Sequence, residues 1–202
     1  TQHAIINREV CHEESEKMKV EVNGNTLELM TGDITKQSTE AIVNAANGTL
    51  LGGGGVDGAI HRAAGPELLE ACKRVRAEEL HGEYLPTGEA VITDGYRLPA
   101  KYVIHTVGPV WRGGTNHEEQ LLANCYRHSL QLAMDKGMAS ISFPSISTGV
   151  YRFPVDLASV IALRTVIGFL QVHAFGHVVM TLFSEKDYQT YESALRQVLD
   201  ES

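Results

Sequence analysis

The sequence lacks the cysteine patterns that build disulfide scaffolds and zinc sites. Its 202 residues include three cysteines, Cys11, Cys72 and Cys125, and no two of them have C-x-x-C spacing. This odd, dispersed set is typical of reduced thiols and excludes a zinc ribbon or finger. A single core at this length buries roughly 70% of the surface of the unfolded chain, so the fold needs no structural metal. We therefore expect a reducing, cytoplasmic location.

Positive charge and long apolar runs are also scarce. There are 17 Lys and Arg residues against 25 Asp and Glu residues, which gives a net charge of −8. This sign disfavours electrostatic capture of nucleic acid. No apolar run reaches about 18 residues and the start of the chain is polar, which argues against a membrane span and a signal peptide. We expect a monomer with no membrane or nucleic-acid partner.

The first residues differ in pattern from the rest of the chain. Residues 1–18 show no clear hydrophobic periodicity and include Glu13, Glu14 and Glu16. We interpret them as a leader that is loosely ordered or packed on the surface. Residues 19–202 contain no internal repeat and no Pro/Ser-rich linker, which predicts one domain.

Short apolar runs alternate with helical patterns along this domain. Val20 and Val22 alternate with charged residues before Asn23-Gly24, which predicts a β-hairpin. Further strands are predicted at 41–43, 91–92, 102–107, 141–143 and 178–183, and helices at 56–75 with a break at Gly65-Pro66, 118–136, 155–170 and 184–199. Strands alternating with helices predict an α/β fold, in which a mainly parallel sheet with antiparallel strands near its start is covered on both faces.

Four consecutive glycines, Gly52 to Gly55, stand just before a predicted helix. Glycines lose the most backbone entropy on ordering, so this run indicates a close approach of the backbone to another group. Their N–H groups can form a concave nest, and the helix that follows adds its free N–H groups and positive end. The run therefore predicts a site for a phosphate or diphosphate. The alternative is a flexible surface turn.

Better-known catalytic and phosphate-binding motifs do not fit. Gly53, Gly55 and Gly58 satisfy G-x-G-x-x-G, but eight residues separate the run from the preceding strand, unlike a dinucleotide-binding fold. A P-loop needs Gly-Lys-Ser/Thr, whereas Val56-Asp57 follows Gly55. The sequence also has no G-x-S-x-G motif, and its helical cysteines have no evident basic partner, so it offers no candidate for covalent catalysis.

Several further motifs occur in a fixed order, at Gly32–Thr35, Asn44–Asn47, Gly52–His61, Pro86–Ala90, Tyr102–Pro109 and Ser147–Tyr151. On these motifs, residues 19–199 resemble the macrodomain family, and in particular its MacroD-type hydrolase branch. The resemblance implies a three-layer α/β/α sandwich around a mixed sheet that binds ADP-ribose in a cleft. It also implies hydrolysis of mono-ADP-ribose esters of Asp and Glu side chains in proteins, and deacetylation of O-acetyl-ADP-ribose.

The resemblance also assigns residues to the ligand. Asp33 would accept from the adenine amine, with the N–H of Ile34 on a ring nitrogen, although Asp33 also fits a helix N-cap. Phe183 would stack on adenine, and Tyr151 and Phe153 would pack against the distal ribose. The alternative for Phe153 and Phe183 is that each is a residue of the hydrophobic core. The other expected ADP-ribose contacts are Asn44, which would mainly brace its loop, together with Gly53, Gly54, Gly55, Val56, Ser145, Ser147, Thr148, Gly149 and Val150.

Catalysis is expected from Asn47, Asp57 and His61. Asp57 and His61 are spaced i, i+4 and project from one helix face, and the helix N-terminus favours the ionised Asp57. Asn47 would fix a ribose hydroxyl, and a water held between Asp57 and a ligand phosphate would attack. The plainer alternative is that Asp57 is an ordinary first-turn residue hydrogen-bonded to His61.

Two other functions remain open from the sequence, a reader module that binds ADP-ribose without turnover and a regulator that binds RNA or a protein partner. No cofactor is expected. The glycine run differs from the Cys/His-bearing loop of zinc-dependent macrodomains, which predicts metal independence. His105 lies inside a strand pattern and is interpreted as an interior histidine, and His173 with His177 is a weak metal-site candidate.

Overall fold

The structure, a computed structural model, describes Ile6–Asn7 and residues 17–201. The leader predicted over residues 1–18 therefore lies largely outside the described residues. Its described part includes β1 (Ile6–Asn7), which pairs antiparallel with β2 (Lys17–Val22). The first long strand begins at Lys17, two residues before the predicted domain boundary at residue 19.

The described strands form one mixed sheet in the order β1-β2-β3-β8-β7-β4-β6-β5. The remaining strands are β3 (Asn25–Thr31), β4 (Ala41–Ala46), β5 (Ala90–Asp94), β6 (Tyr102–Val107), β7 (Ser140–Phe143) and β8 (His177–Leu182). The middle of the sheet, from β3 through β8, β7 and β4 to β6, is parallel. The mainly parallel sheet and the antiparallel hairpin near its start are confirmed, and the strand predicted at 91–92 is β5, whose antiparallel pairing at the edge was not predicted.

The helices begin and end close to their predicted positions. They are η1 (Ile34–Lys36), α1 (Gly55–Ala64), α2 (Pro66–Glu78), α3 (Glu118–Asp135), α4 (Val155–Val172) and α5 (Glu185–Asp200). Gly65 has a φ of 88°, which ends α1, and Pro66 opens α2 at a position where its missing N–H costs nothing. Ser184 caps α5 by accepting from the N–H of Asp187 at 3.1 Å.

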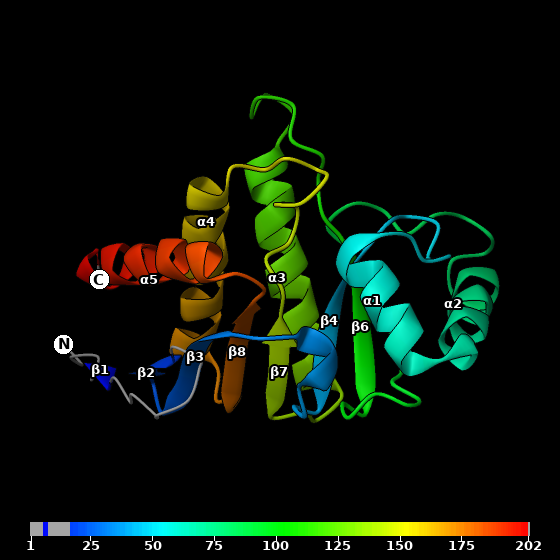
Figure 1. Ribbon diagram of the computed structural model, residues 1–202, viewed down its shortest axis with the longest axis horizontal. Helices are drawn as coiled ribbons and strands as arrows, with labels where there is room; N and C mark the ends of the chain where they lie inside the picture. Colours follow the sequence, from blue (N-terminus) through cyan, green and yellow to red (C-terminus); the bar gives the residue numbers. More distant parts are fainter. Residues whose placement is uncertain (1–5, 8–16, 202) are drawn as a thin grey trace.

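Helices cover both faces of the sheet. Along β6, the side chain of Ile104 joins the core formed with α3, α4 and α5, whereas Val103 and Val107 join the core formed with α1 and α2. Because successive side chains of a strand point to opposite faces, the two cores lie on opposite sides of the sheet. Figure 1 shows α1 and α2 at one end of the row of strands and α4 and α5 at the other. The three-layer α/β/α sandwich is confirmed.

By length and composition alone, α4 is the one helix of the described chain that could cross a membrane. Its buried face, which includes Ala162, Leu163 and Val166, belongs to the core shared with α3 and α5. This packing accounts for its apolar composition.

The topology brings several loops to one edge of the sheet. The parallel strands β3, β4, β7 and β8 all end at the same edge, and ligands of α/β proteins bind at such carboxyl ends. The N–H of Gly32 donates to the carbonyl of Leu182 at 2.9 Å, so the residues after β3 and β8 start side by side. The loops after β4 and β7 carry the glycine run and the Ser145–Tyr151 segment.

The buried Asn25 ties the first hairpin to the loop after α4. Its Nδ2 lies 3.0 Å from the Leu170 carbonyl and 2.9 Å from the His173 carbonyl, and its Oδ1 accepts from the N–H groups of Phe175 and Gly176 at 2.8 Å. Asn25→Ala would leave several of these buried backbone groups without a hydrogen-bond partner. We therefore expect the free energy of unfolding to fall by about 2–4 kcal/mol in urea denaturation. Asn25→Asp keeps the acceptor but places a carboxylate oxygen against the Leu170 and His173 carbonyls, so we expect a loss at least as large; a clearly smaller loss would show that the Nδ2 hydrogen bonds contribute little.

Candidate functional site

A cleft with a cavity volume of about 420 Å³ lies at the carboxyl ends of β4 and β7. One wall comes from the end of β4 and the glycine loop, and the other from the loop after β7. The lining residues are Ala45, Ala46, Asn47, Gly53, Gly54, Gly55, Val56, Asp57, Gly108, Ser145, Ile146, Ser147, Gly149, Val150 and Tyr151. The phosphate-binding run predicted from the sequence is therefore one wall of a cleft.

The glycine loop is shaped by positions that exclude side chains. Gly52 and Gly55 have φ of 85° and 57°, a region that residues with a Cβ rarely adopt. At Gly58, a Cβ would lie 2.4 Å from the carbonyl oxygen of Gly53, so the first turn of α1 packs directly on the loop. The N–H groups of that first turn have no partner within the helix, and Gly55, Val56 and Asp57 line the cleft. This wall therefore offers backbone donors and the positive end of α1 to an anion.

Asp57 lies in the first turn of α1 and is 6% exposed. Its Oδ1 accepts from Asn44 Nδ2 at 2.8 Å and lies 3.4 Å from Nε2 of His61. Burial raises the pKa of Asp57 above its ordinary value, while the Asn44 hydrogen bond and the charge of His61 oppose that rise. The sequence predicted that the helix N-terminus favours the ionised form, whereas burial, which the sequence did not reveal, favours the neutral form.

Asn47 lies across Gly53 from Asp57. A Cβ built on Gly53 would be 3.3 Å from Asn47 Nδ2 and 3.4 Å from Asp57 Oδ2. The amide donates to the Gly52 carbonyl at 2.8 Å, and its oxygen accepts from the N–H of Thr49 at 3.1 Å. A donor and a carboxylate oxygen thus meet at the backbone of one glycine, in the wall of the cleft.

The opposite wall is a braced loop. Ser145 Oγ hydrogen-bonds to the Tyr191 hydroxyl at 2.7 Å, and Thr148 Oγ1 donates to Ser145 Oγ at 2.9 Å. Ser147 has a φ of 68°, and its buried Oγ has no hydrogen-bond partner. Val150 is 92% exposed. The loop is fixed at its base and open at its tip.

A third group of residues adjoins the cleft at the ends of β3 and β8. Asp33 Oδ1 accepts from the N–H of Thr35 at 2.9 Å and from its Oγ1 at 2.7 Å, so Asp33 is the N-cap of η1. Ile34 is buried, and Phe183 is 87% exposed directly after β8. Neither Asp33, Ile34 nor Phe183 belongs to the lining of the cavity itself. They share its edge of the sheet through the Gly32–Leu182 hydrogen bond.

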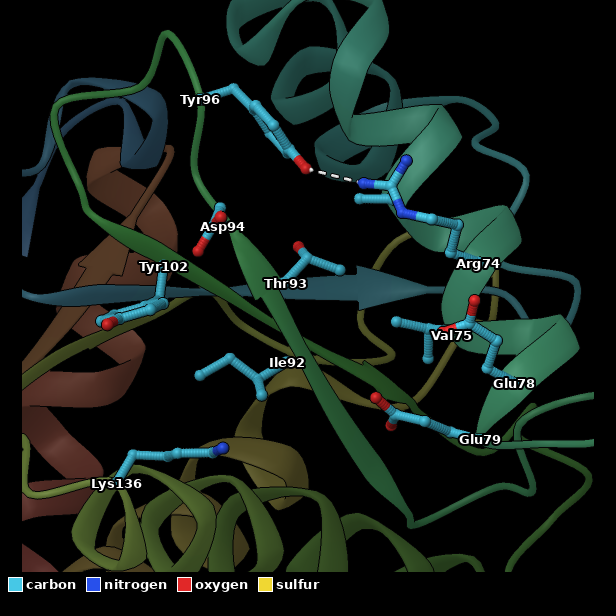
Figure 2. Close-up of a pocket in the computed structure, with 11 residues that line it drawn as sticks. Arg74, Val75, Glu78, Glu79, Ile92, Thr93, Asp94, Tyr96, Tyr102 and Lys136 are labelled. Atoms are coloured by element: carbon cyan, nitrogen blue, oxygen red, sulfur yellow. Dashed lines mark hydrogen bonds between the residues drawn. The ribbon is translucent and has the colours of Figure 1, made fainter.

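A second cavity, of about 360 Å³, lies at the other end of β6 (Figure 2). Its wall includes Thr93 on β5, and its rim includes the exposed side chains of Arg74, Asp94 and Lys136. Arg74 donates to the Tyr96 hydroxyl at 3.3 Å. No glycine loop or α1 N-terminus faces this cavity, so the cleft at the ends of β4 and β7 is the better candidate site.

Comparison with known proteins assigns the family. A family model described as Macro domain matches residues 43–162, more than half of the chain. The chain belongs to the macro domain family. A macro domain-containing protein from Methanosarcina mazei is 52% identical over 91% of this chain and 95% of its own length. A relative from Escherichia fergusonii named O-acetyl-ADP-ribose deacetylase is 53% identical over 87% of this chain and 98% of its own length.

Solved macrodomains have the same fold. One from Oceanobacillus iheyensis, solved with ADP, has a TM-score of 0.92 at 56% identity, covering 94% of this chain and all of that chain. One from Trypanosoma brucei, in complex with ADP-ribose, has a TM-score of 0.75 at 44% identity, covering 84% of this chain and 68% of that chain. The macrodomain fold implied by the sequence motifs is confirmed.

Besides Asp33, Ile34 and Phe183, four more residues that the sequence assigned to this macrodomain's site lie outside the cleft lining. Asn44 is fully buried beneath Asp57, which it holds, and Thr148 braces its own loop. The Nε2 atom of His61 lies 3.4 Å from Asp57 Oδ1, and the His61 ring packs next to Gly52. The Phe153 side chain is 1% exposed and packs against Trp111, with ring centroids 4.7 Å apart. The core alternative holds for Phe153, and the predicted contact of His61 with Asp57 is present.

Other reactive side chains are occupied or inert. Burial raises the pKa of the Cys72 and Cys125 thiols to about 12 and about 11, so neither forms a thiolate at neutral pH. His177 Nε2 lies 2.9 Å from Glu28 Oε2, and the ring of His173 packs on Phe169. Within residues 6–7 and 17–201, no group of three or more His, Cys, Asp or Glu side chains could hold a metal ion.

Sequence reasoning treated His105 as an isolated interior histidine and missed its link to the site. The ring is fully buried, and the pairing of β4 with β6 places it opposite Asn44, the residue that holds Asp57. Because these strands are far apart in the chain, only their pairing reveals the contact.

Proposed function

We propose that this macrodomain binds ADP-ribose and hydrolyses esters on its distal ribose, deacetylating O-acetyl-ADP-ribose and removing mono-ADP-ribose from acidic side chains of proteins. The observation that carries the proposal is the meeting of Asn47 Nδ2 and Asp57 Oδ2 at Gly53, beside a helix N-terminus that opens into the cleft. A reader of ADP-ribose needs the anion-binding wall but no buried carboxylate at the ribose end. Relatives named O-acetyl-ADP-ribose deacetylase and macrodomains solved with ADP and ADP-ribose support the proposal.

The cleft walls suit the parts of this ligand. The diphosphate would lie between the glycine loop and the loop from Ser145 to Tyr151, held by backbone N–H groups. Such donors let a protein of net charge −8 bind an anion without a cluster of lysines. Adenine would lie toward Asp33 and Phe183, and the exposed Phe183 ring is free to stack on it.

The reaction would use Asp57 as a general base. Water held between Asp57 and a ligand phosphate would attack the ester as Asp57 takes its proton. The bond between the acyl group and the ribose oxygen would then break, and Asp57 would return the proton to that oxygen, which gives ADP-ribose and the free acid. A raised pKa makes the carboxylate a stronger base than an ordinary aspartate. Asn47 would hold the ribose hydroxyls in place. The proposed enzyme is monomeric, cytoplasmic and needs neither metal nor cofactor.

The test compares the wild type with Asn47→Ala on both esters in the presence of EDTA. Free ADP-ribose is measured from a glutamate-linked mono-ADP-ribosylated protein, acetate from O-acetyl-ADP-ribose, and ADP-ribose affinity by calorimetry. We expect turnover by the wild type and a loss of roughly 10- to 100-fold in the variant, because orientation of the ribose is lost. If the wild type binds ADP-ribose but turns over neither ester, the protein is a reader. If it does not bind ADP-ribose, the proposed ligand is wrong.

A further inference from the structure

A chain of buried polar groups runs from β5 through β6 and β4 to Asp57. Thr93 Oγ1 lies 2.9 Å from His105 Nε2, His105 Nδ1 lies 3.1 Å from Asn44 Nδ2, and Asn44 Nδ2 lies 2.8 Å from Asp57 Oδ1. Asn44 and His105 are fully buried, and Thr93 is 7% exposed. Each link crosses from one strand or helix to the next, so the pairing of the strands holds the chain in register.

The direction of the hydrogen bonds follows from the chemistry of the groups. An amide nitrogen donates and cannot accept, so Asn44 uses one N–H for Asp57 and the other for Nδ1 of His105. Burial lowers the pKa of His105 to about 3, so its ring is neutral at physiological pH. With Nδ1 accepting, the single ring proton is on Nε2 and points to Thr93 Oγ1.

The unpaired amide oxygen of Asn44 indicates that the two hydrogen bonds of the amide nitrogen set the orientation of the whole amide. Asn44 Oδ1 is buried and has no hydrogen-bond partner among the residues that the structure describes, which is costly for a carbonyl oxygen. Rotating the amide by 180° would place that oxygen against Asp57 Oδ1 and against the lone pair of His105 Nδ1. An acceptor on His105 and a carboxylate on Asp57 together hold the amide in the arrangement that leaves its oxygen unsatisfied.

We propose that His105 and Thr93 are positioning residues, which fix the Asn44 amide and through it hold the Asp57 carboxylate in its catalytic orientation. The proposal rests on the hydrolase function proposed above. Neither residue lines the cleft: His105 is fully buried, with Cys72 Sγ of α2 3.8 Å from its Nε2, and Thr93 reaches the wall of the second cavity, where Figure 2 shows it on β5. The groups that hold the catalytic carboxylate thus extend to the other end of the sheet.

A conservative pair of substitutions at Thr93 tests the chain. Thr93→Val keeps the shape of the side chain but removes the hydroxyl that accepts from His105, which frees the ring proton to move to Nδ1. A proton on His105 Nδ1 would then face an N–H of the Asn44 amide, and the repulsion between these two donors would break the hydrogen bond from Asn44 to Asp57. We expect kcat to fall about tenfold, ADP-ribose affinity to stay within about twofold, and Thr93→Ser to behave as the wild type. Equal kcat values for the wild type and Thr93→Val would overturn the proposal.

The pH profile gives a readout that a merely structural role would not move. Asp57 faces the titratable groups His61 on α1, Cys72 on α2 and, through Asn44, His105 on β6. Donation from Asn44 stabilises the ionised carboxylate, so its loss raises the pKa of Asp57. The acid limb of kcat/KM should therefore move to higher pH in Thr93→Val and not in Thr93→Ser. An unchanged acid limb in Thr93→Val contradicts the proposal.

NMR of the free protein separates this proposal from the proposed function. Long-range ¹H–¹⁵N spectra report the tautomer of His105; a proton on Nε2 in the wild type supports the chain, and a proton on Nδ1 overturns it. If the wild type cleaves neither ester, the hydrolase function fails, and the ¹³C-detected titration of the Asp57 carboxyl group decides the positioning role. A higher midpoint in Thr93→Val supports that role, and an unchanged midpoint overturns it.

Discussion

Replacing Asp57 by asparagine is expected to lower turnover of both esters by about 10²- to 10⁴-fold, the range typical for loss of a general base. The substitution keeps the shape of the side chain and an oxygen that can accept from Asn44, but the amide cannot take a proton from water. The donors for the diphosphate are backbone groups of the same wall and stay in place. We therefore expect ADP-ribose affinity, measured by calorimetry, to change by no more than about threefold.

The same substitution should stabilise the fold at neutral pH. Burial raises the pKa of Asp57 in the folded protein, so the folded state binds the proton more tightly than the unfolded chain. Stability from such a group is fully present below its unfolded pKa and is lost as the pH rises through the folded pKa. Asp57→Asn removes this loss, and we expect the free energy of unfolding at pH 7 to rise by about 0.5–2 kcal/mol, with a smaller gain in acid.

Asp156 provides the matched control, because it is an exposed aspartate in the first turn of α4. Asp156→Asn should leave turnover unchanged and weaken the helix slightly, through loss of a favourable charge at its N-terminus. Turnover of Asp57→Asn within tenfold of the wild type would exclude Asp57 as the base. Unfolding curves in urea at pH 7 and in acid provide the stability comparison for both variants.

Features set by neighbours in the chain were predictable from the sequence. The break between α1 and α2 depends on Gly65 and Pro66, and the glycine-loop wall of the cleft depends on a glycine run followed by a helix. The spacing of Asp57 and His61 also placed the two side chains together. In each case the deciding contacts lie within a few residues, so local geometry is sufficient.

Features that depend on packing were not predictable. The contact of Asn44 with His105 exists because β4 and β6 pair, although the two residues are 61 positions apart. Phe153 follows the second loop directly, but its direction toward Trp111 is decided by the core. The ionisation of Asp57 depends on both kinds of feature: the helix end is local and favours the charged form, whereas burial comes from the whole fold and raises the pKa.

Packing also reverses the expected effect of a substitution in α1. Alanine in place of a helical glycine ordinarily stabilises a protein by about 0.5–1 kcal/mol, because it restricts the unfolded chain. At Gly58, however, the new Cβ would lie 2.4 Å from the Gly53 carbonyl oxygen and 3.1 Å from Arg62 Nη1. The glycine loop must move away from α1 to admit it. We expect Gly58→Ala to lower the free energy of unfolding by about 1–3 kcal/mol in urea denaturation.

Displacement of the loop should also weaken ADP-ribose binding, because the Gly53 backbone lies between Asn47 and Asp57 and forms part of the cleft wall. A shift of about 1 Å in such groups is enough to lower ADP-ribose affinity at least tenfold and catalysis further. Gly168 in α4 is the control, since a Cβ there meets nothing within 4 Å, and Gly168→Ala should stabilise the fold with no change in binding. If Gly58→Ala instead matched Gly168→Ala in both stability and affinity, the close contact of α1 with the loop would have no part in shaping the site.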